Sequence, residues 1–332
     1  MITRGGRAMI PFRRVPLTNP SSNRPEPTPP ELKYTHKPTP KECAEVKRAL
    51  ATATNFPPEL VDIIMDFAEY WACSVASIDY SVTADRGLAI HGGTGGGENR
   101  FILRTEPLGL TAWHSEKPKL WQAAAPARRL GKEYPRAELE RFIEGPPSTL
   151  DHPFRKIVFD IVSRDQGWSD AIDTHGTCRS SWTWFDAGID RFDKAHTCSG
   201  ENDERSETEG SNSSEKVPTT CAIRPIWPPL KETSSEYDHQ LLPTADHRIQ
   251  CNYVADHEWQ HHRVEWSCTD NIDPTSNAGK ELDSVGRGSA TGDGTFLRSL
   301  KVGDMLTVWG RARFPGWMNS VQKVQVEVYW AL

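Results

Sequence analysis

The fold of this chain is decided by the stretch Met305-Leu-Thr-Val-Trp-Gly-Arg-Ala-Arg-Phe-Pro-Gly-Trp-Met-Asn-Ser-Val-Gln-Lys-Val-Gln-Val-Glu-Val-Tyr-Trp330. An extended run covers 305–314, a Pro-Gly turn follows at 315–316, and strict alternation begins at 321. One face of the alternating run carries Val324, Val326, Val328 and Trp330, and the other carries Lys323, Gln325, Glu327 and Tyr329. Alternation with period two is typical of a half-buried β-strand, so this end of the chain predicts two strands around a turn.

Further strands are predicted upstream, at 156–163, 180–189, 248–254 and 260–266. No helix-length periodic segment follows residue 151, and the polar, glycine-rich stretch 270–294 is predicted to be a loop. Six to eight strands without helices favour an antiparallel sandwich. We therefore predict an α+β chain in which residues 151–332 form a tryptophan-rich antiparallel β-sandwich or jelly roll.

The composition indicates long polar segments around that core. Hydrophobic residues make up 36% of the 332 residues, below the roughly 45–50% of ordinary globular chains. Residues 1–41 are rich in proline and predict a disordered tail, and the acidic stretch 199–216 predicts a disordered insertion in the sandwich. Residues 42–150 are predicted to hold a small helical segment and an irregular connection, with a short strand at 99–104 and a short helix at 137–143.

Charge and cysteine content limit the classes of partner. A net charge of −6 argues against a nucleic-acid partner. The sequence contains no run of 18 apolar residues, so no membrane span is predicted. The chain has seven cysteines, none of them in a CxxC pair, and no apolar leader is recognised at its start. Both observations favour reduced thiols in the cytoplasm or nucleus. A mitochondrial leader is the alternative, because Arg4, Arg7, Arg13 and Arg14 precede the first acid, Glu26, although prolines interrupt any helix there. The glycine run 92–97 fits no phosphate-loop pattern, and no cofactor is expected.

A helix is predicted over 55–71, because proline suits its first turn and acids favour its N-terminal end. The helix carries one apolar stripe, made of Leu60, Ile63, Ile64, Phe67 and Trp71. Two interpretations stay open. The stripe packs on the neighbouring domain, or it docks a partner protein, in which case its side chains must be exposed.

A ligand site is predicted where aromatic and polar side chains meet in the sandwich. The candidate residues are Asp165, Gln166, Trp168, Trp182, Trp184, Arg311, Arg313 and Trp317. Aromatic faces beside polar groups hold sugars and peptides. The alternative is that most of these tryptophans form the core and the arginines stack on them. Trp168 and Trp317 follow glycines in predicted turns and are expected to be the exposed pair.

Three patterns suggest enzymes or metal sites. His257-Glu-Trp-Gln-His261 matches the H-E-x-x-H zinc-hydrolase motif, which needs a helix over 253–264. Alternation after Gln260 predicts a strand there instead. His175 and Cys178 could join His196 and Cys198 around zinc. Asp165, Asp170, Asp186 and Asp190 could supply a glycosidase pair.

Several phrases resemble known families. The start Phe56-Pro-Pro-Glu-Leu60 resembles the first helix of an F-box over about 20 residues, which implies a Skp-type adaptor as partner. Ala68-Glu-Tyr-Trp71, Asp165-Gln-Gly-Trp168 and Arg313-Phe-Pro-Gly-Trp317 resemble an uncharacterised family of filamentous-fungal proteins. That resemblance implies a fold similar to galactose-binding-like sandwiches and transfers no catalytic residues.

The sequence therefore predicts a non-enzymatic interaction protein. Its sandwich would hold a partner protein or another ligand, and its N-terminal helix would dock either on the sandwich or on an adaptor. A carbohydrate-binding module is the second prediction, and a zinc hydrolase using His257, Glu258 and His261 is the third.

Overall fold

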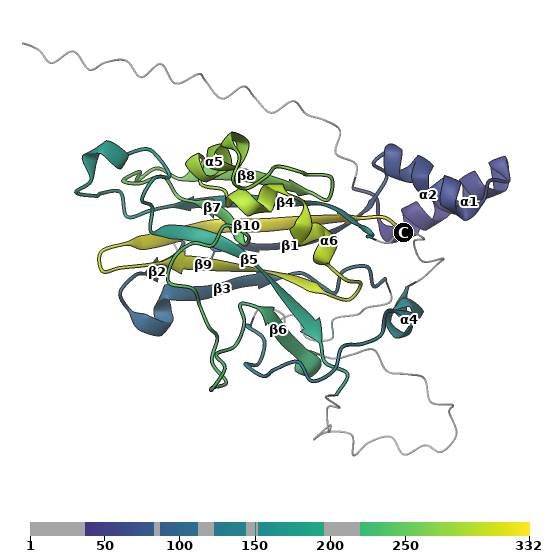
Figure 1. The fold of residues 1–332 in the computed structure, drawn as a ribbon, viewed down its shortest axis with the longest axis horizontal. Helices are drawn as coiled ribbons and strands as arrows, with labels where there is room; N and C mark the ends of the chain where they lie inside the picture. The colour runs from purple at the N-terminus through teal and green to yellow at the C-terminus, as the bar shows by residue number, and fades with distance from the viewer. Residues whose placement is uncertain (1–36, 83–86, 112–122, 144–149, 151, 196–219) are drawn as a thin grey trace, which may run out of the picture. The chain divides into compact units, whose positions relative to one another are not determined.

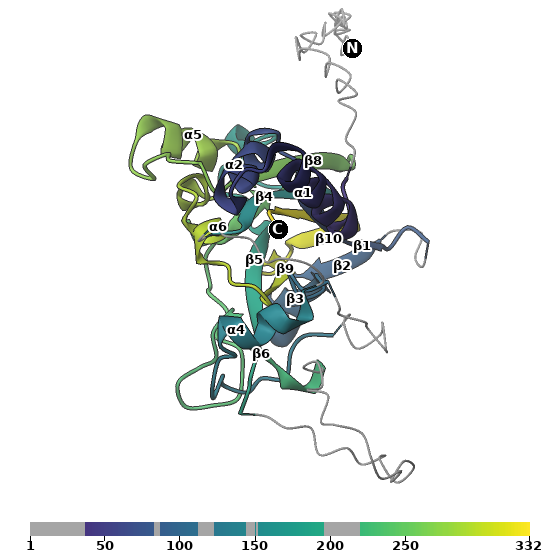
Figure 2. The ribbon, with the colours of Figure 1, turned by 90° about the vertical axis from the view of Figure 1, so that its right-hand side faces the viewer.

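Two antiparallel β-sheets form a sandwich in the computed structural model, which confirms the predicted α+β class (Figures 1 and 2). The structure describes residues 37–82, 87–111, 123–143, 150, 152–195 and 220–332. Most of the predicted tail and all of the predicted acidic insertion lie outside these residues. No helix in the described part of the chain is both long and apolar enough to span a membrane.

The first sheet has the order β1-β10-β4-β8, and β2 also pairs with β10. Its strands are β1 (Ala72–Asp79), β2 (Leu88–His91), β4 (Phe154–Arg164), β8 (Gln260–Ser267) and β10 (Met318–Trp330). The long strand β10 is central, because β4 pairs along nearly its whole length and β1 and β2 share its other edge. The alternating run of the sequence therefore becomes the middle of a sheet.

The second sheet has the order β3-β9-β5-β6, and β7 also pairs with β5. Its strands are β3 (Asn99–Arg104), β5 (Thr183–Phe192), β6 (Ile223–Trp227), β7 (Arg248–Cys251) and β9 (Met305–Ala312). Seven strands, β4 to β10, follow residue 151 within the described residues, as predicted. Both faces of β9 are buried, because loops cover the outer face of this sheet.

Consecutive strands β9 and β10 lie in opposite sheets. The turn between them bends sharply, with φ of 65° at Phe314 and 91° at Gly316. Glycine adopts a positive φ without steric cost, which explains the Pro-Gly pair at this point. The strands were predicted correctly, but their separation into two sheets is a property of the tertiary structure.

The sandwich extends further toward the N-terminus than residue 151. Strand β1 pairs with β10, and β3 pairs with β9, so residues predicted as an irregular connection complete both sheets. Only the short strand at 99–104 was expected there. The signal of β1 is weak because Ala72, Ser74 and Ala76 are small, so the hydrophobic contrast between its faces is low.

Helices α1 (Pro40–Thr54) and α2 (Pro58–Phe67) agree with the predicted helical segment, and α4 (Arg136–Leu139) begins the short helix predicted at 137–143. Thr39 and Glu42 form a capping box at the start of α1, which satisfies amide groups that the first turn leaves free. Short 3-10 turns lie at Gly95–Glu98, Glu140–Phe142, Ile172–Thr174, Thr220–Ala222 and Ser289–Gly292.

The predicted loop at 270–294 is instead partly helical, which corrects that prediction. It contains α5 (Asn277–Ser284), and α6 (Thr295–Ser299) follows directly. Ser276 caps α5 by accepting a hydrogen bond from the Gly279 amide at 3.1 Å. Both helices are too short to show the 3.6-residue period on which the prediction relied.

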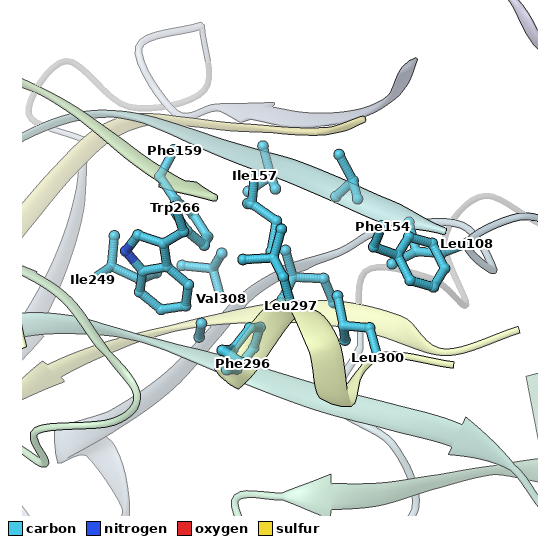
Figure 3. Close-up of a cluster of buried hydrophobic side chains, with 14 of the residues drawn as sticks. Leu108, Phe154, Ile157, Phe159, Ile249, Trp266, Phe296, Leu297, Leu300 and Val308 are labelled. Atoms are coloured by element: carbon cyan, nitrogen blue, oxygen red, sulfur yellow. The ribbon is translucent and has the colours of Figure 1, made fainter. Parts of the chain in front are cut away.

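Helix α6 supplies part of the core between the sheets. Figure 3 shows Phe296 and Leu297 of α6, with Leu300 beyond it, among side chains of β4 and β9. Trp266 of β8 packs edge-on against Phe296, with ring centroids 4.9 Å apart. Burial of such large apolar side chains is the main source of folding free energy.

A polar network also joins the sheets near the β9–β10 turn. The Asn252 amide nitrogen donates to Thr183 of β5 and to Asn319 of β10, each at 3.0 Å. Ser163 of β4 donates to the Asn252 side-chain oxygen at 2.7 Å. All four side chains are fully buried, and a satisfied buried network of this kind fixes how the two sheets align.

The stability of the sandwich should depend on pH through His262. Burial lowers its pKa from 6.5 to about 4, so the folded protein holds it neutral where the unfolded chain takes up a proton. Neutral His262 contributes fully to the free energy of unfolding above about pH 6.5. This contribution falls by about 1.4 kcal/mol per pH unit as the pH is lowered toward 4. The free energy of unfolding, measured in urea, should therefore fall by about 2 kcal/mol less in His262→Phe than in the native chain when the pH is lowered from 7 to 5.

Exposed Ile172 provides the control, because its side chain does not titrate. Ile172→Ala should keep the pH dependence of the native chain. An unchanged pH dependence in His262→Phe would contradict the assignment of this titration to His262.

Candidate functional site

Helix α2 carries an exposed apolar surface. Its members are Phe56 (44% exposed), Leu60 (45%), Ile63 (44%), Ile64 (38%) and Phe67 (88%). Phe56 precedes the helix and was not part of the predicted stripe. We call these five residues the α2 apolar face. Large apolar side chains gathered on one helix face are typical of an interaction site.

The opposite side of α2 holds the helix in place. Val61 and Met65 are buried in the main hydrophobic core. Asp62 forms an ion pair of 2.5 Å with buried Lys47 of α1, and Lys47 also donates to the main-chain oxygen of Leu332 at 2.7 Å. The α2 apolar face is therefore presented by a helix that is anchored on its other side.

Trp71 does not belong to the α2 apolar face, contrary to the predicted stripe. Helix α2 ends at Phe67, and Glu69 has a φ of 50°, which terminates the helical path. The Trp71 indole donates to Asp66 at 2.9 Å, and the Asp66 carboxylate also accepts from Arg155 at 2.5 Å. The side chain thus helps to fix the base of the helix.

Acidic groups dominate the charge around α2. Residues 55–71 contain four acids and no base. Asp62 and Asp66 are paired with cations of the sandwich and α1, and Glu69 lies 3.6 Å from Lys156. Glu59 and Glu69 are exposed. Glu59 and Glu69 are therefore the acids of α2 and the residues after it that a protein covering the α2 apolar face could meet, which favours a basic side chain on that protein.

The predicted ligand set is divided between the interior and the surface. Trp184, Arg311 and Arg313 are almost fully buried on the outer side of the second sheet. The Arg313 guanidinium lies 5.2 Å from the centre of the Trp184 ring, and Arg311 lies 5.3 Å from that of Trp309. These three residues therefore match the alternative in which arginines stack on core tryptophans.

Ion pairs and hydrogen bonds occupy these arginines. Arg311 donates to Asp186 at 2.9 Å, and Asp186 also accepts from the Trp184 indole at 2.9 Å. Burial, with Arg311 and Arg313 nearby, lowers the pKa of His239 to about 3. The imidazole is thus neutral, and its Nδ1 accepts a hydrogen bond from Arg311 at 2.6 Å. The arginines hold the 237–241 loop over the sheet.

The carboxylates considered for glycoside hydrolysis also have structural partners. Asp190 pairs with Arg104 at 2.6 Å. Buried Asp165 accepts from the amides of Gly167, Ala255 and Asp256 at 2.6–3.1 Å. Asp165 therefore joins two loops at the end of the sandwich.

Trp168 is the exposed member of the predicted set, with 58% of its surface accessible. Gln166 holds its loop, because its amide group donates to the Trp168 carbonyl and accepts from the Met318 amide. The indole lies against Gly316, where an added Cβ would come within 3.3 Å of the ring. Trp317 is only partly exposed, and Trp182 packs edge-on against Phe314 with ring centroids 4.8 Å apart.

The H-E-x-x-H segment is not helical. His257 and Glu258 lie in a loop, and His261 lies on β8 with its Nε2 2.8 Å from Asp160. The two imidazoles are therefore not one helical turn apart, as the zinc-hydrolase motif requires. Among the described residues, no three His, Cys, Asp or Glu side chains form a group that could hold a metal ion.

The second predicted zinc set is likewise not assembled among the described residues. His175 Nε2 lies 2.8 Å from the Ser169 carbonyl, and buried Cys178 approaches the Cys251 carbonyl. His196 and Cys198 lie outside the described residues. Among the described residues, five cysteines carry free thiols, whereas Cys221 is disulfide-bonded, so the prediction of reduced thiols is wrong for Cys221.

Comparison of the chain with protein-family models, curated proteins and solved structures gave no match. The resemblances to an F-box start, to a fungal family and to galactose-binding-like sandwiches therefore stay predictions.

Substitutions should separate the buried and exposed members of the predicted ligand set. Arg311→Leu leaves the Asp186 carboxylate buried without its cation and should lower the free energy of unfolding by about 3–5 kcal/mol. Trp168→Ala removes an exposed ring and should change it by less than about 1 kcal/mol. Urea unfolding at pH 7 measures both, and equal losses would contradict the structural role of Arg311.

Proposed function

We propose that this chain is a non-enzymatic interaction protein that docks a partner protein on the α2 apolar face. The observation that carries the proposal is the exposure of Leu60, Ile63, Ile64 and Phe67 on a helix whose other side is anchored. Exposed apolar side chains are costly in water, and a matching apolar surface on a partner removes that cost.

The proposed partner presents an apolar surface flanked by lysine or arginine. The exposed acids Glu59 and Glu69 support this charge. A Skp-type adaptor is the specific candidate, and the F-box-like start of α2 supports it. The proposal does not include the other helices of an F-box, because β1 begins at Ala72.

The double substitution Ile63→Glu with Phe67→Glu tests the docking. Both side chains are exposed, so charge at these positions should leave the fold intact and weaken adaptor binding by at least about tenfold. Isothermal titration of the full chain with a purified Skp-type adaptor gives the affinities. The matched control is Ile172→Glu, since Ile172 is 79% exposed but lies in the loop between β4 and β5, away from α2.

Three results would count against the proposal. An adaptor that binds the native chain and the double variant equally well docks elsewhere. An adaptor that fails to bind the native chain is not the partner. A native dimer that becomes monomeric in the double variant, measured by sedimentation velocity, means that a second copy of the chain covers the helix.

Carbohydrate binding is a second candidate, and the exposure of Trp168 favours it. An exposed indole held by its loop can stack on the apolar face of a sugar ring. Trp168→Ala should abolish retardation of the chain in a native gel that contains galactomannan, whereas Ile172→Ala should not. Equal migration of the native chain with and without the polysaccharide would exclude this candidate for galactomannan.

A further inference from the structure

A cavity of about 420 Å³ opens where α4, the end of β5 and the connection from α6 to β9 meet. Pro153 borders this cavity directly before β4 begins, whereas Trp168 follows the last residue of β4. The cavity and the Trp168 loop therefore lie at opposite ends of the sandwich. The cavity volume is within the range of small-molecule sites, roughly 300–1,000 Å³.

The walls of the cavity consist largely of apolar side chains that also pack in the hydrophobic interior. They are formed by Tyr134, Leu139, Pro153, Phe192, Leu300 and Val302. Leu300 belongs to the main core, and Leu139 and Phe192 belong to a second hydrophobic cluster. The walls are therefore held in place by the core. A hydrophobic molecule that enters the cavity gains free energy by leaving water.

Four of the charged side chains that line the cavity bind one another. Arg191 donates two hydrogen bonds to the Asp304 carboxylate, at 2.6 and 2.8 Å. The Glu133 carboxylate connects Arg191 to Lys301, with oxygen–nitrogen distances of 2.5 and 2.6 Å. Two cations and two acids thus form one continuous network, and their charges cancel.

The two other arginines of the lining are engaged by groups outside it. Arg136 forms an ion pair with Glu140 at 2.6 Å. The Arg298 guanidinium donates to the main-chain oxygens of Cys268 and Asp293, at 2.6 and 2.7 Å. None of these three partners is among the described residues that line the cavity. A charged ligand would therefore lose its hydration without meeting a free counter-charge, which is costly.

We propose that this cavity binds a small uncharged molecule with a hydrophobic body. The apolar walls take the body, and the engaged charges of the lining select against ions. An ion either enters without a counter-charge or breaks an existing ion pair, and each costs free energy. A neutral molecule of the same shape avoids both costs. The α2 apolar face is not part of this site, so the proposal stands independently of the adaptor.

Isothermal titration of the full chain with matched neutral and charged probes tests the proposal. One set is 2-naphthylmethanol, 2-naphthoate and 2-naphthylmethylammonium, and the other is octanol, octanoate and octylammonium, so the two sets differ in the shape of the body. The titrations are run at about pH 8, where the exposed His152 imidazole at the cavity is neutral. At least one alcohol should bind with one-to-one stoichiometry and at least about tenfold more tightly than both of its ions.

Val302→Trp should fill the cavity and abolish binding of that alcohol. Val285→Trp is the matched control, because Val285 is 53% exposed at the end of α5 and is not among the described residues that line the cavity. Thermal unfolding shows whether each variant is folded, and Val302→Phe replaces the tryptophan variant if that variant does not fold.

Two results on the native chain would overturn the proposal. It is wrong if neither alcohol binds, and it is wrong if an ion binds as tightly as its alcohol. Full affinity for the alcohol in a folded Val302 variant means that the alcohol binds elsewhere, which also contradicts it.

Discussion

The structure depends on the turn that separates β9 from β10. Neighbouring strands usually pair, but here a residue with positive φ and a Pro-Gly pair direct them into opposite sheets. Each strand then becomes central in its own sheet, and their apolar faces meet across the core. The buried network around Asn252 and Asn319 lies beside this turn and joins the two sheets there.

This topology gives the sandwich two different ends. The loop that carries exposed Trp168 lies at the end of the sandwich where the β9–β10 turn is found. The helices α1 and α2, the cavity and the last residue of the chain lie at the other, as Figure 1 shows for the helices and the C-terminus. The two ends have different surfaces, one aromatic and one apolar with charged borders, so they suit different ligands.

Charged residues inside the second sheet explain why its sequence resembles a ligand site. Asp186 and Arg311 lie on the outer face of adjacent strands, where loops cover them. A buried charge is stable only with a partner and further hydrogen bonds, so tryptophan, arginine and aspartate gather there. Sequence alone does not distinguish this arrangement from a sugar site, because both need the same residue types.

Helix α2 shows how far the prediction reached at the candidate site. Its apolar stripe was identified from spacing, and such a stripe ordinarily faces the core. In the structure Val61 and Met65 face the core instead. Asp62 and Asp66 form ion pairs with Lys47 and Arg155 on that side of the helix. Lys47 lies on another helix and Arg155 is distant from Asp66 in the sequence, so the periodicity of α2 does not reveal these ion pairs.

The sequence by itself determined the local elements: the alternating strand β10, most of the strands after residue 151 and the two first helices. These follow from periodicity and from turn or capping residues, which act between neighbours in the chain. Tertiary structure decided which sheet takes β9 and β10, which side of α2 is buried, and where the cavity lies. Each depends on contacts between residues distant in sequence, as when β1 at Ala72 pairs with β10 at Trp330.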